Sequence, residues 1–481
     1  MSVIKNKPLR SAALLVATLM IAGCALGPKG TAPQLPQPLH YGVEVTPTEV
    51  DGAGLVQHFK LGQRPVPTWW QAYHSEQLSA WVDEALLNNF SLSQANNNLA
   101  AAREQLRAQV GSSLYPSVDA VVQADRQRAL GLPAFGPQTN LYNVFAGKLT
   151  ASYTFDLFGV ASYANSALAA QVDSQSYQLD AARRAVASNL VIAAINSAAL
   201  RAQVDITKTL IQLADVDVDE LQRRVQLGSA ARSDLLNAQA NAQGLRAGLP
   251  GLLTQWHSTR HALAVLMGRT PNAAPDDLDL AALTLPDTIP VSVPSDLLKQ
   301  RPDILAADAA LKVAAAQEAL ATAQMFPSLS ITASFGHAGF TVPTAESGAG
   351  AVWGLGTSLL QPLFHGGALR AHRDAAHDAY LAAADNYRQT VLNAFQNVAD
   401  TLSALTHDGD ALTAAANQRR YSEQNWQDAQ RRAALGAIPA SASRAGEKQF
   451  QHARLDELRA VSARLADTAL LYQAMGLPEA K

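Results

Sequence analysis

Cysteine is almost absent from this chain: one residue, Cys24, occurs among 481, and it directly follows an uncharged apolar run. Charged residues are few, at 16%, and 37 basic against 40 acidic residues leave a net charge of −3. That balance provides no basic field for a nucleic acid. Aromatic residues make up 6% and hydrophobic residues 48%, which excludes a disordered chain and a bundle of membrane-spanning helices but allows a buried core.

The run before Cys24 is too short to cross a bilayer, which requires about 20 apolar residues. It spans residues 12–22 and follows three basic residues, the order typical of a secretory signal. The sequence IAGC at 21–24 resembles a bacterial lipobox, in which the chain is cut before the cysteine and the thiol is acylated. We therefore expect residues 1–23 to be a lipoprotein signal peptide and Cys24 to be lipidated. Ala25 resembles the sorting rule for the outer membrane.

The chain contains an internal repeat. Three short motifs recur in matching order at a nearly constant offset: LYPSV at 114–118 and MFPSL at 325–329, RRVQLG at 223–228 and RRAALG at 431–436, and VLMG at 265–268 and QAMG at 473–476. A constant offset over most of the chain indicates two copies of one unit. We place the first repeat at 68–268 and the second at 304–476.

Prolines mark the segments outside the repeats. Residues 24–67 are rich in proline and are predicted to form an extended N-terminal tail. Residues 269–303 are also interrupted by prolines, and we expect this linker to wrap around the equator of the protein. Residues 477–481 form a short C-terminal tail.

Each repeat has the same order of elements. A β-hairpin is predicted at about 117–158 and again at about 328–364, because apolar and polar residues alternate there with a period of two. A helix without a breaker follows each hairpin, at about 165–226 and at about 369–434. The sequence therefore predicts a mainly α fold with a small β part, in two tandem repeats.

The long helices are unusual for a globular protein. At 1.5 Å per residue they extend roughly 90 to 100 Å and need partners along their whole length. The shorter helical segments supply these partners if they stack end to end in pairs, 91–114 with 231–268 and 304–325 with 438–475.

The four strands decide the class of function if they enter a membrane. Four strands cannot close a barrel, and an open sheet edge in lipid leaves unpaired amides. Several chains would then share one barrel, and a barrel continuing into a sheath of helices is a duct. A hairpin exposed to water is the alternative, which alternation in the sequence alone does not exclude.

Six segments together resemble the TolC-like outer-membrane efflux factors, in particular the lipoprotein branch (OprM/NodT type) that works with resistance-nodulation-division pumps. In chain order they are WWQAYHSEQLSAWVDEALLNNFSL at 69–92, YTFDLFG at 153–159, RRVQLGSAARSDLLNAQA at 223–240, ALAVLMGRTP at 262–271, RPDILAADAALKVAAAQEALATAQMFPSLSI at 301–331 and LLQPLFHGG at 359–367. Their order, the internal repeat and the lipobox make the resemblance specific, and it covers nearly all of the chain after residue 23.

The resemblance implies an assembly. It implies a homotrimer with a shared twelve-stranded transmembrane β-barrel, an α-helical barrel through the periplasm, and docking to a periplasmic membrane-fusion (adaptor) protein and an inner-membrane resistance-nodulation-division pump. The chain would be a lipid-anchored and barrel-inserted protein of a Gram-negative outer membrane. Its function would be that of the exit duct of a tripartite efflux pump, without enzyme activity or a cofactor.

The turns that end the two long helices are the expected adaptor-docking tips. Glycine can adopt the left-handed conformation there and leaves backbone open to a partner, although a plain helix cap is the commoner role of glycine. The residues of these tips are Leu227, Gly228 and Ser229 in the first repeat and Leu435, Gly436 and Ala437 in the second.

The entrance gate departs from the pattern of the family. Members usually carry aspartates six and nine residues after the second tip glycine, where this chain has Ala442 and Ala445. The first tip keeps Asp234, which we expect to form part of the gate. Its expected partners are Arg232 in the same chain and, at the adjoining tip, Arg431, Arg432 or Arg444. An ordinary aspartate at a helix N-terminus is an equally good interpretation of Asp234.

Other polar groups give no strong indication of chemistry. His257 and His261 have the spacing of two zinc ligands on a helix, but the metalloprotease glutamate between them is missing. His365, His372 and His377 lack a tight ligand pattern, and Asp215, Asp217 and Asp219 point to different faces of a helix, so solvated side chains are favoured over metal sites.

Two other classes of function remain open at this stage. One is a helical scaffold lipoprotein anchored to the outer membrane, which would need the same anchor and helices but would not conduct ions. The other is an enzyme on an α+β body, although the sequence carries no G-x-S-x-G, Walker or dinucleotide-binding motif. Neither class changes the predicted anchor.

Overall fold

The computed structural model describes residues 27–35, 40–43, 47–63, 66–130, 139–347 and 350–476. Cys24, the expected signal peptide at 1–23 and the C-terminal tail at 477–481 therefore lie outside the described residues. The chain forms two compact units, and each takes segments from both sequence repeats. The repeats are therefore not separate domains. The prediction of a mainly helical fold with a small β part is confirmed.

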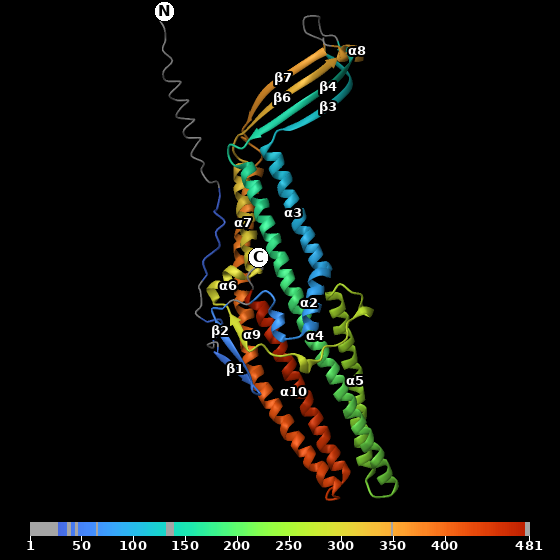
Figure 1. The fold of residues 1–481 in the computed structure, drawn as a ribbon. Coiled ribbons are helices and arrows are strands. Elements are labelled where there is room, and N and C mark those ends of the chain that lie inside the picture. The colour runs from blue at the N-terminus through green and yellow to red at the C-terminus, as the bar shows by residue number, and fades with distance from the viewer. Residues whose placement is uncertain are drawn as a thin grey trace, which may run out of the picture. The chain divides into compact units, whose positions relative to one another are not determined.

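Of the described residues, the first unit contains those within 27–33, 99–175 and 307–387. Its sheet has four antiparallel strands in the order β3–β4–β6–β7 (Figure 1). The strands are β3 (Ser117–Leu130), β4 (Thr139–Phe155), β6 (Ser328–Gly339) and β7 (Ala351–Leu360), and the short helix α8 (Val342–Glu346) lies between the last two. Each repeat supplies one hairpin, and the β4–β6 pairing joins the two repeats.

The register of this sheet separates apolar from polar rows. Leu149 on β4 lies opposite Phe335 on β6, which lies opposite Trp353 on β7, and all three are exposed, by 54%, 62% and 79%. The next row, on the other face, pairs Thr150 with Ser334. Because successive side chains of a strand point to opposite faces, the sheet has one apolar and one hydroxyl-rich face. This arrangement matches the predicted period of two.

The helices of the first unit meet the sheet at matching junctions. The unit contains parts of α3 (Phe90–Leu114), α4 (Val160–Gln226), α7 (Pro302–Ala323) and α9 (Ala368–Ala434). Asp156 accepts hydrogen bonds from the backbone N–H groups of Ala161 and Ser162, at 3.0 and 2.8 Å, and so caps α4. Phe158 stacks on Phe326, with ring centroids 5.0 Å apart, which connects the junctions of the two repeats.

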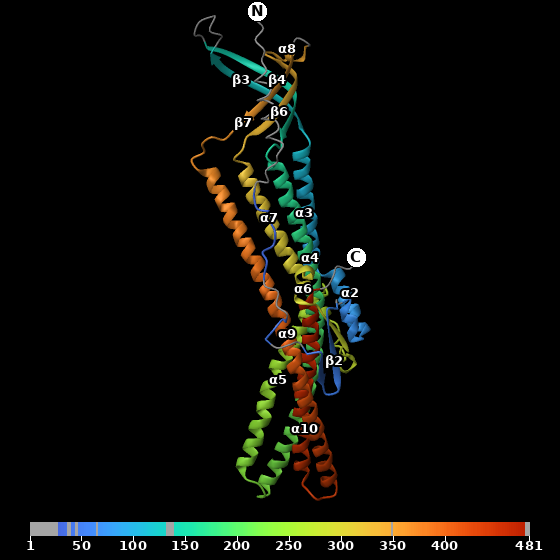
Figure 2. The ribbon, with the colours of Figure 1, turned by 90° about the vertical axis from the view of Figure 1, so that its left-hand side faces the viewer.

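Of the described residues, the second unit contains those within 34–98, 176–306 and 388–476. The rest of α4 forms a helical hairpin with α5 (Arg232–Leu266), and the rest of α9 forms another with α10 (Ala440–Met475), as Figures 1 and 2 show. Among the described residues α4 alone is long and apolar enough to cross a membrane, but 56% of its most apolar window is buried inside the protein. Packing within the protein therefore accounts for the apolar character of α4.

A small sheet beside these helices differs from the prediction of a uniformly extended tail at 24–67. The tail contains a hairpin of β1 (Glu49–Gly52) and β2 (Leu55–Leu61), and β2 pairs in parallel with β5 (Thr288–Val291). The linker at 269–303 supplies β5 together with α6 (Pro294–Gln300). The tail and the linker are therefore parts of one sheet, which the sequence does not reveal because parallel pairing joins segments far apart in the chain.

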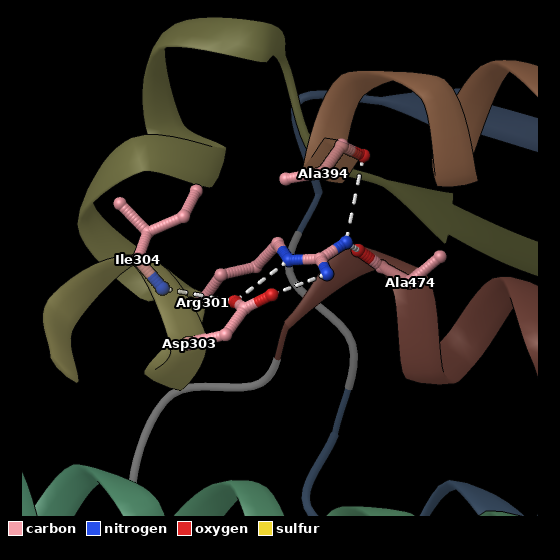
Figure 3. Close-up of polar contacts among 5 residues, drawn as sticks. All are labelled: Arg301, Asp303, Ile304, Ala394 and Ala474. Atoms are coloured by element: carbon pink, nitrogen blue, oxygen red, sulfur yellow. Dashed lines mark hydrogen bonds and ion pairs between the residues drawn. The ribbon is translucent and has the colours of Figure 1, made fainter. Parts of the chain in front are cut away.

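Arg301 connects the start of α7 to the end of α10 (Figure 3). Its Nη1 donates to the carbonyl oxygens of Ala474 at 2.7 Å and Ala394 at 3.5 Å, and its Nε and Nη2 pair with both carboxylate oxygens of Asp303. Asp303 also accepts a hydrogen bond from the backbone N–H of Ile304. Ala474 lies in the last turn of α10, so the buried Arg301 satisfies a carbonyl group that has no partner within that helix.

Candidate functional site

The first tip is a capped helix end. Gly228 has a φ of +71°, and its N–H donates to the carbonyl of Val225 at 3.0 Å. The N–H of Ser229 donates to the carbonyl of Arg224 at 2.8 Å, which completes a Schellman cap. Leu227 is 81% exposed at this turn.

The second tip repeats this geometry. Gly436 has a φ of +75°, its N–H donates to Ala433 at 3.0 Å, and the N–H of Ala437 donates to Arg432 at 2.9 Å. Leu435 is 84% exposed. A Cβ at either tip glycine would meet nothing within 4 Å, so glycine is required for the positive φ and not for a close contact. Both tips thus present an exposed leucine beside open backbone, and their role in docking stays a prediction.

Asp234 lies in the first turn of α5, with its backbone N–H donating to Ala231 at 3.1 Å. Its side chain and that of Arg232 are exposed, and across the described ranges neither forms an ion pair. The two residues are therefore not paired within one chain. The position does suit a carboxylate that interacts with the N-terminal end of the helix dipole.

Arg431 and Arg432, the expected partners of Asp234 at the second tip, have different contacts. Arg431 forms an i,i+3 ion pair with Asp428 on the surface of α9. Arg432 contributes its carbonyl oxygen to the cap of the second tip. Among the described residues neither forms an ion pair with Asp234, and a contact between neighbouring chains stays a prediction.

Arg444 takes part in a cluster that joins the two helical hairpins. Its Nε donates to Oδ1 of Asp217 at 2.6 Å, and its Nη2 pairs with Glu220. Lys448 pairs with the other oxygen of Asp217. We call Asp217, Glu220, Arg444 and Lys448 the inter-hairpin cluster. Its two acidic residues lie on α4 of the first repeat and its two basic residues on α10 of the second.

The inter-hairpin cluster is partly shielded from water. The side chains of Arg444 and Asp217 are 17% and 18% exposed, and the cluster borders a cavity of about 250 Å³. Burial opposes the charge on Arg444, but hydrogen bonds to Asp217 and Glu220 raise the pKa of this guanidinium above its usual value. The guanidinium of Arg444 therefore stays charged within the cluster.

The acidic stretch at 215–219 was expected to be solvated, and for Asp217, whose side chain is 18% exposed, that expectation is wrong, whereas Asp215 is 41% exposed. Asp215 accepts hydrogen bonds from Arg246 of α5 at 2.6 and 2.7 Å, whereas Asp217 pairs with α10. The two carboxylates do point to different faces of α4. The spacings i,i+3 at 217 and 220 and i,i+4 at 444 and 448 place each pair on one face of its own helix, but nothing in the sequence indicates that the two helices pair.

The histidines do not form a metal centre in the part of the chain that the structure describes, where no group of three or more possible ligands occurs. His257 and His261 are exposed, with ring centroids 6.4 Å apart. His377 pairs with Glu318 at 3.1 Å on the surface of α7 and α9. Solvated or surface-paired side chains account for these residues.

The chain has relatives of similar length. The antibiotic efflux pump outer membrane protein ArpC of Pseudomonas putida is 28% identical over 433 residues, covering 88% of this chain and 86% of its own. Nodulation protein T of Rhizobium leguminosarum bv. viciae is 26% identical over 403 residues, covering 82% and 78%. The solved structure of the outer-membrane channel OprN covers 94% of this chain and 99% of its own, with a TM-score of 0.81 at 22% identity, and so shares the fold.

Both repeats match one protein family. The family model described as "Outer membrane efflux protein" matches residues 81–269 and 293–477, which is well over half of the chain. The resemblance drawn from the six sequence segments is thereby confirmed. The protein belongs to the outer membrane efflux protein family.

Proposed function

We propose that the protein is the outer-membrane exit duct of a tripartite efflux pump. It passively conducts drugs or other small toxic compounds from the periplasm to the outside when it is docked to a periplasmic adaptor and an inner-membrane pump. The observation that carries this proposal is the sheet of the first unit, with its apolar face, its hydroxyl-rich face and its two long edge strands.

The edges of this sheet favour an oligomer. Among the described residues β3 pairs only with β4, and β7 only with β6, so each edge strand keeps a row of unpaired backbone groups. In lipid such groups cost several kcal/mol each, and closure of the sheet with other copies removes the cost. Three copies, as in the trimers of this family, would give a barrel with its apolar face toward lipid and its hydroxyl face toward water.

The tips and the inter-hairpin cluster support a gated entrance. We assign adaptor docking to the tips at Gly228 and Gly436, where an exposed leucine lies beside open backbone. Closure is assigned to the inter-hairpin cluster within each chain and to a ring of Asp234 side chains between chains. Acylation of Cys24 would add a lipid anchor to the barrel.

The two faces of the sheet provide a matched test. Leu149→Asp places a charge on the apolar face and Thr150→Asp places one on the hydroxyl face of the same strand. A charge on the lipid side of a barrel is unfavourable near the bilayer midplane, by less for Asp than the about 2–4 kcal/mol of Arg or Lys, so L149D should lose membrane-inserted oligomer while T150D should keep it. Light scattering in detergent and membrane fractionation measure both.

The outcomes separate the duct from the scaffold. Wild-type protein that is a monodisperse monomer in detergent contradicts the duct. Equal insertion of L149D and T150D also contradicts it, because the two faces would then have no difference in environment. Either result favours the scaffold lipoprotein.

A further inference from the structure

Helix α5 contains a stretch of residues that oppose helix formation. Gly244, Gly248 and Gly251 lie inside the helix together with Pro250. Glycine destabilises a helix interior because it loses more backbone freedom on folding than any other residue. Proline removes one hydrogen bond of the helix, and its ring clashes with the carbonyl four residues earlier. We call residues 244–251 the weak segment of α5.

The structure gives no steric reason for these three glycines. None has a positive φ, and within the described chain a Cβ at any of them would meet no atom within 4 Å. Because they follow the spacing i, i+4 and i+7, they share one face of the helix, and all three are exposed. Alanine would therefore fit at each position without strain.

The glycines inside the helices of the second hairpin do have a steric reason. A Cβ at Gly409 of α9 would lie 2.6 Å from the carbonyl oxygen of Asp51, and one at Gly446 of α10 would lie 3.3 Å from Cα of Trp426. Close packing therefore favours glycine at both sites. Helix α4 contains neither glycine nor proline over its 67 residues. Of these four described helices, α5 alone has glycines that packing does not explain.

The end of α5 next to the linker is firmly held. Nε1 of Trp256 donates to Oδ2 of Asp277 at 3.0 Å. Nη2 of Arg260 donates to the carbonyl oxygen of Pro275 at 3.0 Å. Asp277 also accepts a hydrogen bond from the hydroxyl group of Ser197 on α4. The linker therefore fastens α4 and α5 to each other on this side of the weak segment.

The tip end of α5 is held more loosely. Among residues 232–251 only Ala242 is buried, and the ion pair of Arg246 with Asp215 is half-exposed. The equivalent residues of α10, 440–459, are packed more tightly. Their buried members are Gly446, Phe450, Gln451, Ala453 and Leu455. The two hairpins thus differ in how firmly their tip ends are packed.

The weak segment lies where bending of the first hairpin would concentrate. Two packed helices bend together only if one changes its length relative to the other. A long unbroken helix such as α4 can curve gently, so the change is absorbed where its partner is least stable. Thr254 adds to this weakness, because its hydroxyl group donates to the carbonyl of Pro250 at 2.9 Å, a local contact that often bends helices.

We propose that residues 244–251 form a hinge, at which the tip of the first hairpin bends while the other end of α5 stays fixed to the linker. The tip at Gly228 then changes its position, whereas the tip at Gly436 ends a hairpin without such a segment. The hinge is a property of the hairpin itself and does not depend on the conducting function. It goes beyond the docking role, which is assigned to both tips alike.

Spin-label distances in the purified oligomer test this hinge. Asn241→Cys and Gln255→Cys place labels at exposed positions on either side of the weak segment, about 21 Å apart along the helix. Gln449→Cys and Ala463→Cys are the equivalent exposed positions of α10. Cys24→Ser removes the native thiol, and variants with one label give the distances between chains. The distance distribution of the α5 pair should be broader than that of the α10 pair.

Removing the glycines should remove the bending. The triple variant G244A/G248A/G251A should narrow the distribution of the α5 pair to the width of the α10 pair. It should also slow hydrogen exchange of the weak segment by about two- to fivefold per substitution. Gly111→Ala in α3 is the matched control, because this helical glycine also has room for a Cβ within the described chain and should leave α5 unchanged.

A further variant tests whether the glycines instead make room for a neighbouring chain. Gly248→Leu adds bulk to the exposed face of α5. Loss of the oligomer in G248L would contradict the hinge and show close packing between chains, whereas an intact oligomer supports the hinge. Equal widths for the α5 and α10 pairs without the glycine substitutions overturn the proposal. So does a triple variant in which the distribution of the α5 pair stays broad.

Discussion

Nη1 of Arg301 lies 2.7 Å from the carbonyl oxygen of Ala474, near the end of α10. The first repeat has the same relationship with a different residue, since Nδ2 of Asn89 donates to the carbonyl of Leu266 at 2.9 Å, at the end of α5. In both repeats a polar residue directly before a helix, α3 or α7, donates a hydrogen bond to a carbonyl oxygen at the end of the last helix of the same repeat, α5 or α10. The internal repeat is thus visible in its hydrogen bonds as well as its motifs.

Arg301→Ala should destabilise the protein by about 1–3 kcal/mol, because it leaves the carbonyl of Ala474 at the end of α10 without its donor. Thermal unfolding of the detergent-solubilised oligomer measures the change. Asn89→Ala is the matched variant at the equivalent joint and should also destabilise, since Asn89 caps Ser91 and Leu92 as well. An unchanged melting temperature in R301A would mean that the joint contributes little.

Gly228→Trp should reduce cross-linking to the adaptor without lowering the yield of oligomer. The tip has room for a side chain, so the bulk would project toward a partner. Gly228→Ala is the control, because it introduces a comparable backbone strain at a φ of +71° with little bulk. If G228W cross-links as well as G228A does, the glycine is a cap and the docking assignment is wrong.

Arg444→Ala should raise the resting conductance of the closed pore, because it removes the ion pairs from α10 to Asp217 and Glu220. Arg246→Ala is the matched control. It breaks the pair with Asp215, which joins α4 to α5 within one hairpin, and should leave the resting conductance unchanged. Equal currents through R444A and wild-type channels would remove the inter-hairpin cluster from the gate.

Asp234→Ala tests the other part of the gate. A ring of these carboxylates between chains would make D234A conduct more at rest, even though each exposed contact contributes only about 0.2–1 kcal/mol. A resting current equal to that of the wild type over a range of salt concentrations would identify Asp234 as a helix N-terminal residue.

Local patterns predicted most of the elements, and long-range pairings were missed. Alternation at 145–157 indicated the strand β4, and the tip glycines indicated the ends of α4 and α9. The small sheet of β1, β2 and β5 was missed because β5 comes from the distant linker. The pairing of Asp217 with Arg444 also joins different repeats, so neither residue identifies the other from its own neighbourhood.

Cys24→Ser should abolish acylation but leave the protein in the outer membrane. A closed barrel binds a bilayer more firmly than acyl chains do, so the variant should assemble more slowly or in lower yield, with the pore preserved. Membrane fractionation and mass spectrometry measure both effects. A variant that is wholly soluble in the periplasm would show that the strands do not insert.

Electrical conductance in a planar bilayer tests the duct most directly. Purified wild-type protein should produce discrete, long-lived conductance steps, with a low current at rest. The steps should become larger in R444A but not in R246A. The apolar-face variant L149D should produce no steps, because it does not insert. Purified oligomer that leaves the bilayer electrically silent, in the wild type and in R444A alike, would contradict the account.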